Sequence, residues 1–279
     1  MHSILIYIAF LVLVYMVLLF IMSLLNKRND IADVGWGLGF IVVAFSALKF
    51  DVYFRGDVDV RSLVLVGLVT MWGLRLFVHI YRRYRSRGED PRYVAMKAHW
   101  GKMATLYSFL EVFLLQGFLL FIIALPVMYG ITTHGVLFPT WFDIMGIALW
   151  TIGFLFETVG DAELGKFLKN PANKGHLMTS GLWSITRHPN YFGEVVVWWG
   201  IWLVAMAGHA PWWTIAGPLM ITYLITHVSG IPMTEARQAS HPEFADYKAR
   251  VSRFIPLYPG KKLFGSWKEV KRQAQAEKH

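Results

Sequence analysis

The sequence predicts an all-α membrane protein with seven transmembrane helices, and three observations lead to that prediction. Hydrophobic residues make up 56% of the 279 residues and charged residues only 16%, whereas soluble domains carry about 25% charged residues. Seven apolar segments are long enough to be read as membrane spans. Basic residues gather in alternate loops between those segments, which is the pattern of a polytopic membrane protein.

The apolar segments define the spans to within a few residues. The first has no preceding basic region and is too long for the core of a signal peptide, so we expect it to be retained as a span. The chain shows no internal repeat, and we expect one integral membrane domain over residues 1–279. The seven segments are 3–25, 31–50, 62–81, 104–129, 141–160, 190–208 and 211–233.

Charge in the loops predicts the orientation. One set of loops holds 23 of the 27 Lys and Arg residues: 26–30, 82–103, 161–189 and the tail from Thr234. The positive-inside rule then places the amino terminus outside and the carboxyl terminus in the cytoplasm. This distribution explains most of the net charge of +9, so nucleic-acid binding is not expected. From Lys261 onward we expect a surface helix or a frayed end.

The absence of cysteine restricts the chemistry. Disulfides, thiolate nucleophiles, zinc–thiolate sites and iron–sulfur clusters are excluded. Two carboxylates, Glu157 and Asp161, lie four residues apart and share a helix face. A metal site would also need histidines in a fixed geometry, and the sequence places none, so no metal is expected.

The segment from Gly181 to Gly200 is the strongest indication of a site. It places polar side chains at the mouth of an apolar span, where such groups are costly and mark function. A basic membrane-interface anchor is the alternative, but an anchor needs no Asn, Tyr or Glu beside its cations. These polar side chains are Arg187, His188, Asn190, Tyr191 and Glu194.

Polar residues within the second and third spans have two interpretations. Asp33 is the first residue of the motif Asp-Val-Gly-Trp-Gly-Leu-Gly. It either stabilises the start of a helix as a first-turn carboxylate or has a functional role. The three glycines allow close helix packing. Arg75 is expected to pair with Asp33 or Glu111 more readily than to catalyse. His79, one turn along the same face, is either a packing residue or a proton donor.

A run of cations follows Asp161. Carboxylates at this helix end could hydrogen-bond to the ribose or adenine of a nucleotide. The cations could bind its phosphates. The positive-inside rule explains the lysines equally well. The residues after the last span could close the same pocket. No glycine-rich phosphate loop is present. The run comprises Lys166, Lys169, Asn173, Lys174, His176, Arg187 and His188. The residues after the last span are Glu235, Arg237, Tyr247, Arg250 and Arg253.

From about Glu157 to Pro256 the chain resembles the steroid 5-alpha-reductase family, in particular its bacterial branch. The matching motifs are Glu157-x-x-x-Asp161, Asn170-Pro-Ala-Asn-Lys-Gly175, Gly181-Leu-Trp, Arg187-His-Pro-Asn-Tyr-Phe-Gly-Glu194, Asp246-Tyr247 and Ile255-Pro256. The Arg-His-Pro-x-Tyr element also occurs in membrane isoprenylcysteine and phospholipid methyltransferases.

The resemblance implies a function. It implies that residues 141–260 hold NADPH in a cavity that faces the cytoplasm. It also implies that a lipophilic enone, such as a 3-oxosteroid, enters from the bilayer and binds beside residues 1–130. The cofactor contacts that it implies include Asp161, Asn190 and Glu194. It also implies a bacterial inner membrane protein, and we expect a monomer.

The amino-terminal half departs from the family. The Gln-Glu pair of the animal enzymes is absent, and Asp33 is the nearest carboxylate in the second span. The family tyrosine of the third span falls near His79, Ile80 or Tyr81. We therefore expect the substrate ketone to be activated by Asp33 of the second span together with His79 or Tyr81 of the third, with Tyr93 or Glu111 next in line.

Two other functions compete with the reductase. One is an S-adenosylmethionine-dependent methyltransferase of the isoprenylcysteine or phospholipid type, which needs no cations for phosphates. The other is a lipid-binding membrane protein without enzyme activity. The basic 161–189 segment favours NADPH, because that cofactor carries a pyrophosphate and a 2′-phosphate.

Overall fold

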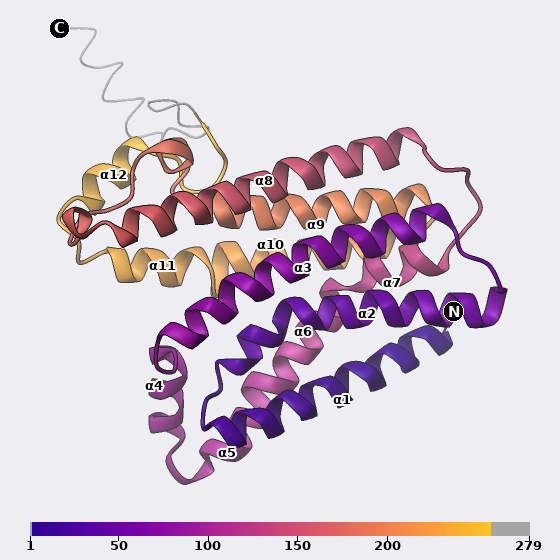
Figure 1. The fold of residues 1–279 in the computed structure, drawn as a ribbon, viewed down its shortest axis with the longest axis horizontal. Helices are drawn as coiled ribbons and strands as arrows, with labels where there is room; N and C mark the ends of the chain where they lie inside the picture. The colour runs from indigo at the N-terminus through magenta and orange to yellow at the C-terminus, as the bar shows by residue number, and fades with distance from the viewer. Residues whose placement is uncertain (1, 258–279) are drawn as a thin grey trace, which may run out of the picture. The chain divides into compact units, whose positions relative to one another are not determined.

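A computed structural model describes residues 2–257, and within them the chain is helical with no strand (Figure 1). The predicted tail from Lys261 lies outside the described residues. Seven helical segments are long and apolar enough to cross a membrane, which confirms the fold class and the number of spans. The orientation of the termini stays a prediction. The seven segments are Ser3–Asn26, Ile31–Arg55, Val60–Ser86, Pro91–Ile123, Trp141–Lys169, Pro189–Ala207 and Trp212–Gln238.

The chain divides into two compact units. Among the described residues, unit 1 comprises 2–151 and 196–222, and unit 2 comprises 152–195 and 223–257. Two long helices, α8 (Trp141–Lys169) and α9 (Pro189–Ala207), contribute a part to each unit. The other helices of unit 1 are α1 (His2–Asn26), α2 (Ile31–Arg55), α3 (Val60–Ser86), α4 (Pro91–Trp100), η1 (Gly101–Met103), α5 (Ala104–Tyr107), η2 (Ser108–Leu114), α6 (Leu115–Ile123), α7 (Leu125–Thr132), η5 (Trp212–Ile215) and most of α10 (Ala216–Tyr223).

Unit 1 is built around a close crossing of α2 and α3. A Cβ atom on Gly37 would lie 2.5 Å from the carbonyl oxygen of Gly73, and a Cβ on Gly73 would lie 2.6 Å from that of Gly37. Only glycine at both positions lets the two backbones approach this closely. The prediction that the glycines after Asp33 serve helix packing is therefore confirmed at Gly37.

Aromatic rings fill the centre of unit 1. Phe40, Trp72 and Trp198 are fully buried, and their ring centroids lie 4.6–5.5 Å apart in tilted and edge-on contacts. Such contacts add to the stabilisation that burial alone provides. A fully buried ion pair, with Arg61 Nε 2.8 Å from Asp143 Oδ1, joins the start of α3 to the start of α8.

The segment 82–103, predicted as a polar loop, is mostly helical, and this prediction is corrected. α3 continues to Ser86, because nothing breaks the helix before Gly88 and because arginines suit the carboxyl end of a helix dipole. α4 then begins at Pro91, with Asp90 capping the first turn. The predicted span 104–129 is likewise divided, because a separate helix, α7, begins at Leu125 with Pro126 in its first turn.

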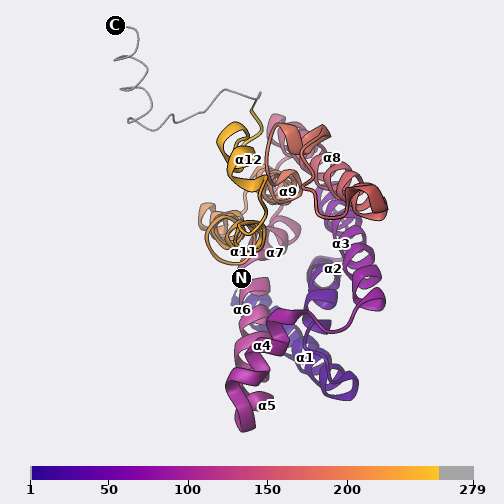
Figure 2. The same ribbon diagram turned by 90° about the vertical axis from the view of Figure 1, so that its left-hand side faces the viewer.

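Unit 2 contains the carboxyl-terminal part of α8 and the start of α9. The predicted loop 161–189 is also corrected, because α8 runs on to Lys169 and ends before Pro171. Figure 2 shows the same helices from the side. The other elements of this unit are η3 (Pro171–Asn173), η4 (Gly181–Ser184), the π-helix η6 (Leu224–Val228), α11 (Ile231–Gln238) and α12 (Phe244–Arg250).

Several contacts hold unit 2 together. A Cβ on Gly193 would lie 2.5 Å from the backbone nitrogen of Glu157, so α8 and α9 are in backbone contact there. A small apolar cluster of Phe244, Tyr247 and Val251 packs α12 against Leu177 in the segment that follows α8. Tyr247 also donates a hydrogen bond of 2.6 Å to the carbonyl of Trp183.

Candidate functional site

Asp33 is the centre of a polar cluster in unit 1. It lies in the first turn of α2. Its Oδ1 accepts hydrogen bonds from the Tyr93 hydroxyl at 2.7 Å and from Gln116 Nε2 at 3.3 Å. Its Oδ2 accepts from Arg92 Nη2 at 3.0 Å. Three donors from α4 and α6 therefore satisfy one carboxylate within the membrane-spanning segments.

The start of α4 positions Arg92 and Tyr93. Asp90 caps this helix by accepting a hydrogen bond from the backbone nitrogen of Arg92 at 2.9 Å. The backbone nitrogen of Asp90 in turn donates to Asp30 at 3.1 Å, which ties α4 to the start of α2. Burial raises the pKa of Asp90, but hydrogen bonds from Arg92 outweigh that effect and hold the pKa below its usual value.

Gln116 completes the cluster and leaves one acceptor unused. Its Nε2 donates to the Tyr93 hydroxyl at 3.1 Å as well as to Asp33. An ionised carboxylate only accepts hydrogen bonds, so the amide nitrogen must face Asp33 and the orientation of the amide is determined. The buried Oε1 of Gln116 then has no hydrogen-bond partner within the described chain. A ligand with a hydroxyl or N–H group would satisfy it.

The other two predicted catalytic residues lie elsewhere on α3. Tyr81 is 40% exposed, and its ring stacks against Phe77 and Tyr84 with centroids 5.4 and 6.4 Å apart. His79 lies on an exposed part of the same helix. The structure therefore joins Asp33 to Tyr93, which the sequence placed next in line, and the described partners of Asp33 do not include His79 or Tyr81.

Arg187 is the centre of a second cluster, in unit 2. Its Nε and Nη2 donate to Glu235 Oε1 at 2.9 and 2.6 Å, and its Nη1 donates to the carbonyl of Val251 at 2.6 Å. The guanidinium is 4% exposed. Nearly all its donors are used within the protein, so Arg187 joins the start of α9 to α11 and to the end of α12.

His188 lies beside this ion pair. Its Nε2 is 3.4 Å from Glu235 Oε1, and its ring stacks on Tyr191 with centroids 5.6 Å apart. Its Nδ1 is buried and has no hydrogen-bond partner within the described chain. Burial lowers the pKa of His188, and the neighbouring Arg187 acts in the same direction, while Glu235 opposes them.

The carboxylate and amide predicted to hold a cofactor meet in unit 2. Asn190 Nδ2 donates to Asp161 Oδ1 at 3.1 Å, so the ends of α8 and α9 are joined at this point. The Tyr191 hydroxyl lies 3.1 Å from Thr234 Oγ1. Glu157 is buried one turn before Asp161, and Glu194 lies one turn after Asn190 in α9.

Exposed cations accompany this pair. Lys166 and Lys169 lie in the last turns of α8, and Lys174 lies just beyond η3. All three are exposed, and no carboxylate of residues 2–257 lies within ion-pair distance of them. The side-chain Nδ2 of Asn173 donates a hydrogen bond to the Phe167 carbonyl.

The remaining predicted residues of unit 2 have structural partners or lie on the surface. Arg250 forms an exposed ion pair with Asp246 one turn away. Tyr247 is buried against Trp183, and burial raises its pKa. Arg237 is exposed at the end of α11. Over residues 2–257, no three His, Cys, Asp or Glu side chains are arranged to hold a metal ion.

Sequence reasoning missed part of the Asp33 cluster for identifiable reasons. Arg92 lies in the segment that was predicted as a loop, so nothing suggested that it shares a site with Asp33, and Tyr93 of the same segment was placed only next in line. Gln116 gave a usable signal, because an amide within an apolar span is costly unless it is satisfied. Thr234, the partner of Tyr191, gave none.

Comparison with known proteins assigns the family. Over 265 residues the chain is 24% identical to an uncharacterised protein of Schizosaccharomyces pombe, a match that covers 85% of this chain and 75% of that protein. A shorter stretch of 46 residues is 44% identical to a probable O-methyltransferase of Ustilaginoidea virens and covers 16% of each protein. The family described as "protein of unknown function (DUF1295)" matches residues 19–251. The chain therefore belongs to the DUF1295 family, which includes membrane proteins like the steroid 5-alpha-reductases.

Proposed function

We propose that this protein is an NADPH-dependent membrane oxidoreductase that reduces a carbon–carbon double bond conjugated to a ketone in a lipophilic substrate, such as a 3-oxosteroid. The observation that carries the proposal is the hydrogen bond between Tyr93 and Asp33 within the membrane-spanning segments. Tyr93 is only 6% exposed, so its phenol, held by a carboxylate, is a proton donor shielded from bulk water. An enone requires such a donor at its carbonyl oxygen.

The cluster supports proton donation by Tyr93. When the Tyr93 hydroxyl turns to a substrate carbonyl, Asp33 keeps two donors, because Arg92 and Gln116 also bind it. Gln116 still donates to the Tyr93 oxygen and stabilises the negative charge that develops there. Asp33 and Arg92 thus act as positioning groups. Tyr93 is the group that would touch the reacting atoms.

Unit 2 fits a phosphate-bearing cofactor through its lysines. Arg187 is committed to Glu235 and to carbonyl groups, so it is a poor candidate for phosphate contact. Lys166, Lys169 and Lys174 are exposed and have no carboxylate partner within residues 2–257. The Asp161–Asn190 pair offers groups for ribose hydroxyls, and the unpartnered Nδ1 of His188 suits a polar ligand atom. When bound, NADPH would supply the hydride.

A methyltransferase is the second candidate, and one comparison favours it. The match to a probable O-methyltransferase is short but has the higher identity. In that case S-adenosylmethionine would bind in place of NADPH. The Asp33–Tyr93 pair would then accept a proton from a substrate hydroxyl instead of donating one.

Cofactor titration separates the two functions. Detergent-solubilised protein is titrated with NADPH and, separately, with S-adenosylmethionine, and binding is followed by calorimetry. We expect NADPH to bind and to reduce an enone steroid in the presence of protein, with loss of the reduced-nicotinamide absorbance. Tight binding of S-adenosylmethionine alone would reject the reductase in favour of the methyltransferase.

A matched pair of variants identifies the cofactor contacts. Lys169→Ala removes one exposed cation of unit 2, and Lys49→Ala removes an exposed lysine of α2 in unit 1. We expect the first variant to weaken NADPH binding and the second to leave it unchanged, because only the first belongs to the predicted phosphate contacts. Equal losses would show that the effect is nonspecific charge attraction.

A further inference from the structure

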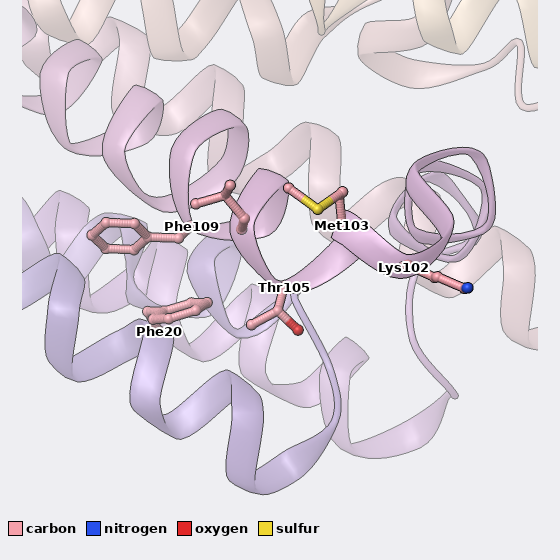
Figure 3. Close-up of a pocket in the computed structure, with 6 residues that line it drawn as sticks. Phe20, Lys102, Met103, Thr105 and Phe109 are labelled. Carbon is pink, nitrogen blue, oxygen red and sulfur yellow. The ribbon is translucent and has the colours of Figure 1, made fainter.

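A cleft opens on unit 1 away from the Asp33 cluster. Its volume is about 350 Å³, and it lies between α1 and the helical segments that follow α4. Figure 3 shows Phe20 of α1 facing Phe109 of η2, with Lys102 at the other end. The lining residues are Phe20, Lys102, Met103, Thr105, Leu106 and Phe109.

Irregular helix geometry accompanies the hollow. The chain passes from α4 into the 3₁₀ turn η1 through Gly101, whose φ is +53°. After the single turn of α5 it enters the π-helix η2. Side chains on such a segment do not form the regular ridges that pack against a neighbouring helix. Phe20 and Phe109 are in contact, with centroids 5.0 Å apart.

The lining combines an apolar surface with one cation. Met103 and Leu106 are 48% and 46% exposed. Both sides of the cleft belong to segments that are long and apolar enough to span a membrane. Hydrocarbon is therefore the natural neighbour of these side chains. Lys102 and Thr105 are exposed, and the side chain of neither has a hydrogen-bonding or ionic partner within residues 2–257.

The nearby cations differ in how they are used. Lys97 forms an ion pair with Glu89 and donates to the carbonyl of Lys27, at the end of α1. Lys102 keeps its charge available beside the apolar cleft. An ammonium group and a hydroxyl next to an apolar cleft match the phosphate and the first part of an acyl chain of a phospholipid.

We propose that this cleft binds one anionic glycerophospholipid, with its phosphate on Lys102 and an acyl chain against Phe20 and Phe109. Charge decides the class of lipid. A phosphatidylglycerol headgroup is negative, whereas phosphatidylcholine carries a quaternary ammonium that a second cation repels. The site is separate from the Asp33 cluster and does not depend on the proposed enzyme activity.

Native mass spectrometry tests the proposal. The full-length protein is released from detergent with equal amounts of phosphatidylglycerol and phosphatidylcholine of identical acyl chains. We expect one retained lipid, with phosphatidylglycerol preferred by roughly fivefold. Lys102→Ala should remove the preference. Lys49→Ala, a control at another exposed lysine of unit 1, should keep it.

A second variant tests the acyl-chain part. Met103→Trp places a larger side chain at an exposed position of the lining, where folding should be unaffected. We expect it to reduce retention of both lipids. Equal retention of the two lipids by the wild type would overturn the proposal, and so would a preference that survives Lys102→Ala. Retention that survives Met103→Trp would also overturn it, because the lipid would then lie elsewhere.

Discussion

Tyr93 and Asp33 lie 60 residues apart in the chain and are joined by a hydrogen bond of 2.7 Å between the Tyr93 hydroxyl and Asp33 Oδ1. Gln116 donates to both oxygen atoms of this bond, at 3.1 and 3.3 Å. A carboxylate, a phenol and an amide thus form a closed group in which each position depends on the other two.

Tyr93→Phe should lower enone turnover by roughly 100-fold or more, because it removes only the hydroxyl that would donate to the ketone. NADPH affinity should be retained, since the predicted cofactor contacts lie in unit 2. Steady-state kinetics and NADPH titration measure the two quantities. Tyr81→Phe is the matched control, because that ring is 40% exposed and lies in a stack with Phe77 and Tyr84. If Tyr81→Phe lowered turnover as much as Tyr93→Phe does, the proton donor would instead be Tyr81 of α3.

Arg187→Ala should destabilise the protein by about 3–5 kcal/mol, because it removes the close, buried partner of the Glu235 carboxylate and leaves it with the half-exposed Arg253 at 4.0 Å. Arg250→Ala is the control. Its ion pair with Asp246 is two-thirds exposed, and exposed pairs contribute about 0–1 kcal/mol. Thermal unfolding in detergent, without cofactor, measures both. An Arg187 variant that unfolds like the wild type but loses cofactor binding would instead make Arg187 a ligand contact.

Stability should fall as the pH drops below about 6.5, in part because of His188. Burial lowers the pKa of His188 from its ordinary value of 6.5. The unfolded chain therefore takes up this proton at a higher pH than the folded protein does. The stabilisation due to neutral His188 is complete above about pH 6.5 and is lost as the pH falls toward the folded-state pKa.

His188→Gln separates this residue from the others that titrate. We expect its melting temperature to change less than that of the wild type between pH 7 and pH 5. His176→Gln should behave like the wild type, because that imidazole is exposed on the surface beside Glu243. A His188 variant with the full acid loss would assign the pH dependence to other groups.

The sequence predicts the parts of this fold that depend on local composition. Apolar length is sufficient to predict the seven spans, and the glycines after Asp33 predict a close helix crossing. Charge was a poor guide to helix ends. Arginines after residue 81 and lysines after Asp161 were interpreted as loops, although cations are favourable at a helix carboxyl terminus.

The site depends on contacts that a linear pattern does not contain. The pairing of Asp33 with Tyr93 requires α4, which was hidden in a predicted loop. The arginine of the Arg-His-Pro motif was expected to meet a phosphate, yet its donors are used by Glu235 and by the Val251 carbonyl. Residue type alone cannot distinguish a cation that binds a ligand from one that joins three helices.

The crossing of α2 and α3 predicts that alanine substitution has different effects on stability at two glycines of α3. Gly73→Ala should destabilise the protein, because the new Cβ would lie 2.6 Å from the Gly37 carbonyl oxygen and the helices must separate. Overpacking of this kind costs about 1–3 kcal/mol. Gly67→Ala, at an exposed position two turns earlier in α3, meets no atom within 4 Å.

Gly67→Ala should therefore be neutral or stabilising by up to about 1 kcal/mol, since alanine restricts the unfolded backbone and favours helix. Thermal unfolding of the two variants in the same detergent measures the difference. The contrast is independent of any enzymatic function, because neither glycine belongs to the Asp33 cluster or to unit 2. If Gly73→Ala were tolerated as well as Gly67→Ala, α2 and α3 would not be in backbone contact. The first turn of α2, which carries Asp33, would then lack the support on which the position of the Asp33 cluster depends.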